Sequence, residues 1–182
     1  MAGAGHVVES HATGERIIFR QTAADTGGQL LRADLLLAPG AAVAGEHVHP
    51  VQEERFEVAR GSIRIRVAGH ERVAGTGAVV IVPPGVPHLL SNPGAVEAHV
   101  VFEFRPALNS ETFFENAFAV MNARGIRPTP RLLLEFGALL AHYRREFHIA
   151  SPPQRLVLAV AGRLGRLAGY RPRFPVDAAA QR

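Results

Sequence analysis

The stretch from Gly45 to Gly61, GEHVHPVQEERFEVARG, constrains the fold most, because it places potential metal ligands on extended chain. His47 and His49 are two residues apart, so both imidazoles point to the same face of a strand. Glu54 follows a short turn that contains Pro50 and begins a second extended run. If this hairpin closes, two ring nitrogens and one carboxylate oxygen converge, which is most of a site for a divalent metal ion.

A second stretch, from Gly77 to Asn92, reads GAVVIVPPGVPHLLSN and delivers His88 after the corner PPGVP. Proline fixes φ and glycine permits a positive φ, so this corner sets the direction of the histidine with little conformational entropy left to lose. Together the two stretches resemble the two motifs of the cupin superfamily, G-x5-H-x-H-x3,4-E-x6-G and G-x5-P-x-G-x2-H-x3-N. The first stretch departs from its motif, since one residue rather than five separates Gly45 from His47, and Gly40 lies nearer the family's position.

The resemblance covers residues 15–106 and implies a metal centre. Carried over residue by residue, the family's ligands fall on His47, His49, Glu54 and His88, which would hold one divalent transition metal ion. The chain has no cysteine, so imidazole and carboxylate groups are the available ligands. Such ligands suit iron, manganese, nickel, copper, cobalt or zinc.

The sequence leaves two alternatives for each of two residues next to the expected ligands, Glu53 and Gln52. Glu53 competes with Glu54 for the carboxylate position, because a slip of one residue in a strand exchanges its two faces. Glu54 is favoured, since six residues separate it from Gly61, as the cupin motif requires. Gln52 either contacts substrate or caps the turn.

We expect four further residues to contact a substrate inside the barrel, namely Phe56, Ile65, Leu90 and His99. The three apolar residues would line a cavity, with ordinary core packing as the alternative. His99 would enter the cavity from the last strand, with an outer position beside Glu97 and Glu103 as the alternative.

The segment from Glu15 to Arg105 consists of short alternating runs of apolar and polar residues that end at Gly or Pro turns. It predicts about nine strands without an intervening helix, which favours an antiparallel sandwich or barrel. The cupin resemblance narrows this mainly β fold to an antiparallel jelly-roll barrel whose mouth holds the metal. Residues 1–14 are small and polar, and we expect them to form a flexible N-terminus.

The hydrophobic period then changes and predicts a C-terminal extension of about three helices in residues 107–182. The first helix spans Ser110 to Arg124, with Ser110 as its N-cap. The second spans Thr129 to Phe147, and the third begins at Ser151 in a sequence that fits a capping box. Each helix has one apolar stripe, which we expect to pack on the barrel or on a second subunit. A lid over the barrel mouth is the alternative.

Composition narrows the class of protein. Apolar residues make up 47% and charged residues 20%, which is typical of a soluble globular chain. No apolar run is long enough to cross a membrane and no secretory signal is visible, so we expect a cytoplasmic protein without a membrane partner. The arginines of the C-terminal helices are spaced as on a solvated face, which argues against a nucleic-acid partner. The expected partners are a small-molecule substrate and a second copy of the chain in a homodimer.

The cupin resemblance implies a metal-dependent enzyme that acts on a small oxygenated organic molecule, with an oxygenase of the quercetinase-like kind as the leading hypothesis. A four-ligand set on an ion that accepts six ligands leaves adjacent positions for substrate, water or dioxygen. A redox-neutral cyclase-like or isomerase-like cupin is the second hypothesis. A small-molecule binding module without turnover is the third.

Overall fold

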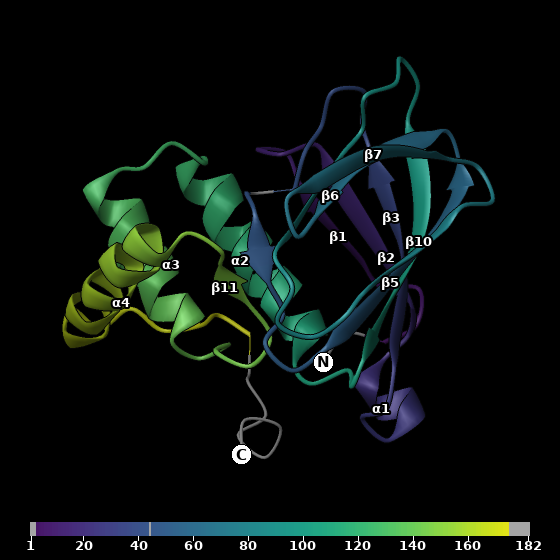
Figure 1. The fold of residues 1–182 in the computed structure, drawn as a ribbon. Helices are drawn as coiled ribbons and strands as arrows, with labels where there is room; N and C mark the ends of the chain where they lie inside the picture. The colour runs from purple at the N-terminus through teal and green to yellow at the C-terminus, as the bar shows by residue number, and fades with distance from the viewer. Residues whose placement is uncertain (1–2, 44, 175–182) are drawn as a thin grey trace.

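Two antiparallel β-sheets dominate the computed structural model, which describes residues 3–43 and 45–174 (Figure 1). The six-stranded sheet has the strand order β1 (Val7–Ser10), β2 (Glu15–Gln21), β3 (Leu31–Leu37), β10 (Ala98–Arg105), β5 (Glu53–Arg60), β8 (Val79–Val82). The five-stranded sheet has the order β11 (His148–Ile149), β4 (His47–Val48), β9 (His88–Ser91), β6 (Ser62–Val67), β7 (His70–Gly75). The chain is therefore mainly β in its N-terminal part, as the alternating runs predicted.

Helices occupy the remainder of the described chain. They are α1 (Ala23–Thr26), α2 (Ser110–Arg124), α3 (Pro130–Leu140) and α4 (Pro152–Leu167). The last three gather on one side of the two sheets (Figure 1). Among the described residues, no helix combines the length and apolar character that crossing a bilayer requires.

The alternation of side chains along the strands builds the core between the sheets. In β6, Ile63 and Ile65 are fully buried while Arg64 between them is exposed. In β10, Phe102 and Phe104 are buried on the inner face, while Glu103 between them is buried on the other face. Because successive side chains of a strand point to opposite faces, each strand contributes one row to a shared core.

The helical extension is tied to the sheets by polar contacts at its start. The side-chain amide of Gln52 donates to the carbonyl oxygens of Pro106 and Ala107, at 2.8 and 3.1 Å. The same nitrogen lies 2.9 Å from the Ser110 hydroxyl, at the first turn of α2. Gln52 therefore joins the loop before β5 to the beginning of the helices.

The extension also returns a strand to the five-stranded sheet. In β11, His148 pairs with Val48 and Ile149 pairs with His47 of β4. The second predicted helix was too long. Helix α3 ends at Leu140, because the chain turns after it through several buried residues to reach β11. Tyr143 and Phe147, which we expected on that helix, lie in this turn segment.

The N-terminus differs from the expected flexible segment. Val7–Ser10 forms β1 and pairs with β2, while residues 1–2 lie outside the described part of the chain. The side chain of Asn122 on α2 donates to the carbonyl of Glu9 at 2.7 Å and accepts from the backbone N–H of His11 at 2.9 Å. These bonds to a helix distant in sequence order a segment whose own composition did not predict a strand.

Three local predictions also need correction. Residues 23–26, in the segment predicted to contain no helix, form α1, which begins with a capping box between Thr22 and Asp25. Asn109 rather than Ser110 is the N-cap of α2, because the Ser110 hydroxyl bonds the Ala107 carbonyl instead. Ser151 does precede α4, but its side chain makes no capping bond. Residues 175–182 of the predicted extension lie outside the described part of the chain.

Candidate metal centre

Four side chains converge between the two sheets. His47 comes from β4, His49 follows that strand directly, Glu54 comes from β5 and His88 opens β9. The strand register places His47 directly opposite His88. One potential ligand atom from each of the four lies within 4.8 Å of the others, and all four residues are buried.

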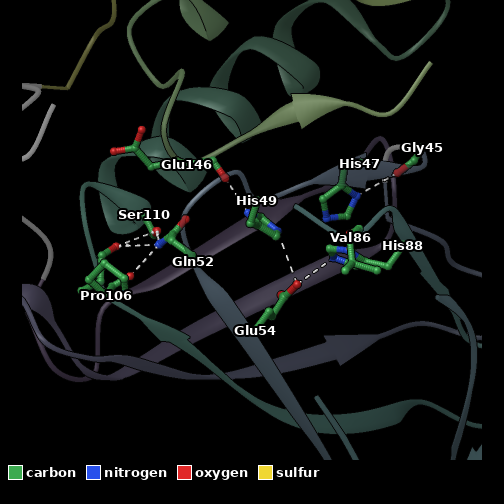
Figure 2. A network of polar contacts seen from close by, with 11 residues as sticks. Gly45, His47, His49, Gln52, Glu54, Val86, His88, Pro106, Ser110 and Glu146 are labelled. Atoms are coloured by element: carbon green, nitrogen blue, oxygen red, sulfur yellow. Dashed lines mark hydrogen bonds and ion pairs between the residues drawn. The ribbon is translucent and has the colours of Figure 1, made fainter. Parts of the chain in front are cut away.

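The shortest contacts in this cluster involve the carboxylate (Figure 2). One oxygen, Oε2 of Glu54, lies 2.8 Å from Nε2 of His88 and 3.3 Å from Nε2 of His49. Glu54 is 5% exposed, whereas its neighbour Glu53 is half-buried on the other face of β5. The strand register therefore assigns the inward position to Glu54, the residue that the motif spacing favoured.

The other ring nitrogen of each histidine meets a backbone carbonyl. Nδ1 of His47 lies 3.0 Å from the oxygen of Gly45, and Nδ1 of His88 lies 3.1 Å from that of Val86. Nδ1 of His49 lies 2.5 Å from the carbonyl oxygen of Glu146 (Figure 2). A carbonyl can only accept, so each Nδ1 carries a proton, and Nε2 is the nitrogen of each ring that faces the cluster and is left to bind a metal.

Burial and mutual charge set the protonation states. Burial lowers the pKa of His47 to about 3, and the neighbouring His88 and His49 add to the shift. Burial acts to raise the pKa of Glu54, but His49 and His88 lower it more, so the net pKa lies below its usual value. For His88, burial lowers the pKa, but its contact with Glu54 outweighs burial and the net pKa is raised. At neutral pH the cluster thus holds a neutral His47 and an ionised Glu54.

The residues present fit a divalent metal ion. Among the described residues, the buried atoms Nε2 of His49, Nε2 of His88 and Oε2 of Glu54 contact one another and have no hydrogen-bond partner outside the cluster. Buried polar atoms are rarely left without a partner, and a cation at their centre would satisfy all three. A set of nitrogen and oxygen donors without a thiolate suits first-row transition metals.

The cluster borders a cavity with an aromatic wall. Eight of the chain's ten phenylalanines line it, and three of them come from α2. The phenylalanines are Phe56, Phe102, Phe104, Phe113, Phe114, Phe118, Phe136 and Phe147. The free space is about 70 Å³, room for about five water molecules.

Comparison with known proteins places this arrangement in a family. Residues 34–103 match the family model described as "Cupin domain", and this range contains all four residues of the cluster. The chain contains a cupin domain.

One curated relative of the cupin domain is named as a polyketide synthase protein. Over 70 residues the chain is 37% identical to the tetracenomycin polyketide synthase protein TcmJ of Streptomyces glaucescens. The match covers 38% of this chain and 46% of that protein, so the chain spans less than half of its curated relative.

Two solved structures share the fold at low sequence identity. KdgF from Halomonas sp. has a TM-score of 0.51 and 15% identity, over 58% of this chain and 92% of that one. A predicted oxalate decarboxylase from Thermotoga maritima has a TM-score of 0.51 and 18% identity, over 58% of this chain and 99% of that one. At these identities the likeness concerns the cupin fold alone.

The residues expected to bind substrate fall into two groups. Phe56 and Leu90 line the cavity of the cupin domain. Ile65 is fully buried but is absent from the cavity wall. His99 lies on the opposite face of β10 from Phe102 and Phe104, and its Nε2 is 3.1 Å from Oδ1 of Asp34. Because side chains alternate between the two faces along β10, His99 points to the outer face, away from Phe102 and Phe104.

Sequence reasoning missed three residues that contribute to the cavity or to the metal cluster beside it. Glu15 lines it from β2, and its position in phase with the inward Ile17 and Phe19 was a usable signal. Glu146 and Phe147 reach the site from the turn before β11, through the carbonyl bond to His49 and a stacked ring on His47. No local pattern in the sequence marks those two, because both contacts join residues distant along the chain.

Proposed function

We propose that this cupin domain binds one divalent transition metal ion through His47, His49, Glu54 and His88, and that the chain is a metal-dependent enzyme. Its substrate is a small oxygenated organic molecule held in the aromatic cavity. An oxygenase is the first candidate. We also propose that the strands are connected as a jelly roll, as the cupin family implies.

The observation that carries the proposal is the convergence of buried ligand atoms at the wall of an apolar cavity. The ligand atoms of His47, His49, Glu54 and His88 lie within 4.8 Å of one another, and among the described residues those of Glu54, His49 and His88 have no hydrogen-bond partner outside the cluster. The cavity beside them is lined mainly by carbon. Binding sites for small molecules combine such an apolar wall with a few convergent polar groups.

The metal ion, the residues that orient its ligands and the aromatic wall would have separate roles. A divalent ion in the cluster would supply Lewis acidity and, if it were redox-active, electron transfer to dioxygen. His47 and His49 are held in orientation by the carbonyls of Gly45 and Glu146. The phenylalanines exclude water, which strengthens every electrostatic interaction inside the cavity.

A redox-neutral reaction is the second candidate, and one finding favours it. The relative at 37% identity is a protein of polyketide synthesis. A cyclase-like or isomerase-like reaction on an oxygenated ring precursor would need the same Lewis acidity without dioxygen.

Metal analysis and oxygen uptake separate these candidates. The protein is purified without added metal, its metal content is measured by mass spectrometry, and oxygen consumption is followed with a panel of flavonols and catechols. We expect about one divalent ion per chain. Iron, manganese, nickel or copper with substrate-dependent oxygen uptake supports the oxygenase. Zinc without uptake, together with conversion of an oxygenated ring precursor, supports the redox-neutral enzyme.

Two outcomes would contradict the proposal. A chain that stays metal-free after incubation with each of the candidate ions has no metal centre. A chain that binds metal and ligands, with thermal stabilisation but no product from any of them, is a binding module.

We also propose that the chain forms a homodimer through α4. Leu156, Val160 and Leu164 on this helix are exposed to at least half of their full extent. With Val157 they form an apolar groove against Pro130, Leu133 and Leu134 of α3. Replacement of Leu156 and Leu164 by glutamate should convert a dimer into a monomer by light scattering, while the metal content stays unchanged. A monomeric wild-type chain at micromolar concentration would refute this interface.

A further inference from the structure

A second carboxyl group borders the aromatic cavity, away from the metal cluster. Glu15 is 6% exposed, lies on the inner face of β2 in phase with Ile17, and lines the same cavity as the histidines. Among the described residues, no ion pair involves Glu15. A carboxyl group in this position has no structural partner of opposite charge to explain its burial.

Burial of Glu15 has a large electrostatic effect. It raises the pKa of this carboxyl group to about 7, against a hydrogen bond with Thr13 that acts to lower it. Near neutral pH the group is present both as a hydrogen-bond donor and as an acceptor. Buried polar groups of this kind discriminate strongly between ligands that satisfy them and ligands that do not.

The strand register places Glu15 and the metal cluster far apart within one cavity. Glu15 pairs with Leu37, at one end of β3. Glu54 pairs with Phe104 of β10, which in turn pairs with Leu31 at the other end of β3. The cavity wall therefore runs diagonally across the six-stranded sheet between two polar groups.

Helix α2 covers the apolar path between the two groups. Its lining residues extend from Phe113 to Met121, a distance of about 12 Å along a helix axis. Phe102 and Phe118 contribute further aromatic wall. A planar ring system that fits this path would contact aromatic faces along its whole length.

We propose that Glu15 is a specificity-determining residue that hydrogen-bonds the far end of an elongated, planar aromatic ligand whose near end carries the oxygen atoms that bind the metal. This inference rests on the proposed metal-binding function and adds the substrate class. The ligand exceeds the free space of about 70 Å³, so its entry requires side chains of the cavity wall to move.

The test uses two dyes that differ only at the far end. Alizarin (1,2-dihydroxyanthraquinone) has a metal-binding diol at one end of three fused rings, and 1,2,7-trihydroxyanthraquinone adds a hydroxyl group on the opposite ring. Each dye is titrated into the desalted zinc-loaded full-length chain, and binding is followed by its absorbance. We expect the trihydroxy compound to bind at least tenfold more tightly to the wild type.

Three variants assign this preference to Glu15. In Glu15→Leu the ratio of the two affinities should fall to about one, because the far hydroxyl group loses its partner. In Glu15→Gln, which can still donate and accept, an intermediate ratio is expected. The control is Glu103→Gln, which alters a buried carboxyl group of β10 that pairs with Arg32 and Arg105 instead of lining the cavity. It should keep the wild-type ratio.

Failure of this inference can be told apart from failure of the metal site. Equal affinities for the two dyes, or the same preference in Glu15→Leu as in the wild type, would overturn the role of Glu15. A chain that binds zinc but neither dye would overturn the aromatic substrate class and leave the metal centre intact. If zinc does not bind at all, the metal centre is wrong, and the ratio of dye affinities in the metal-free protein still decides the role of Glu15.

Discussion

The cupin domain and the helical extension contribute differently to one site. All four potential ligands lie within residues 34–103, the part of the chain that matches the family. Within residues 107–174 the extension contributes no member of the cluster, yet the Glu146 carbonyl orients His49 and the Phe147 ring stacks on His47 with 4.8 Å between centroids. The extension also supplies much of the cavity wall. The residues of the cluster thus belong to the cupin domain, while their orientation and the cavity wall depend on both parts.

The largest effect should come from the cupin side of this comparison. In His49→Ala, one of four donors is lost and Glu54 loses a neighbour at 3.3 Å. Because removal of groups that merely support a ligand costs 10- to 100-fold in metal affinity, loss of the ligand itself should cost more than about 100-fold. Metal analysis after dialysis checks this. Stoichiometric metal in the dialysed variant would refute the ligand assignment.

A smaller but specific effect should come from the extension side. Phe147→Ala removes a buried ring, and such truncations cost about 3–5 kcal/mol of unfolding free energy. It also removes the ring stacked on His47, so metal affinity should fall about 10-fold or more. Denaturant unfolding and metal titration measure the two effects separately.

Phe114→Ala is the matched control for that variant. Phe114 lines the same cavity and stacks on Phe104, but it makes no ring contact with the histidines among the described residues. It should lose stability without losing metal affinity. Equal losses of metal affinity in the two variants would mean that the extension acts only through general stability.

The difference between the two parts also explains what the sequence could predict. His47, His49 and Glu54 are close in sequence, and the period of a strand alone aligns them, so a local pattern identified the candidate ligands. The bond from His49 to Glu146 joins residues 97 positions apart. Its formation depends on where the chain turns after α3 and on the pairing of β11 with β4, and neither has a local signature. The same holds for β1, which is ordered by contacts with α2.

The pH dependence of stability should reveal Glu15 at the far end of the cavity. Its pKa is about 7 in the folded protein and about 4.5 in the unfolded chain. Between these values the folded state binds more protons, so the wild type loses stability as the pH rises from about 4.5 to about 7. The full loss is about 3 kcal/mol.

The variant Glu15→Gln cannot ionise and should lack this contribution. The difference in unfolding free energy between wild type and variant, measured by denaturant titration at pH 5 and pH 8, isolates it from the other titrating groups. A difference that does not change between the two pH values would mean that the Glu15 carboxyl group is solvated in the folded protein.

The smallest effect is expected for His99, which tests the outer face of β10 against the inner one. The His99 ring lies 3.1 Å from Asp34, but Asp34 also accepts a hydrogen bond from Nε of Arg20 at 2.5 Å. In His99→Ala the carboxylate keeps the arginine as its partner, and the contact with a partly exposed imidazole contributes less than about 1 kcal/mol. Unfolding free energy should therefore change little, and metal content and dye affinity should remain those of the wild type. His99 is three residues from Phe102 and five from Phe104, and residues at an odd spacing along a strand point to opposite faces. A loss of dye affinity in this variant would therefore contradict the outward position assigned to His99.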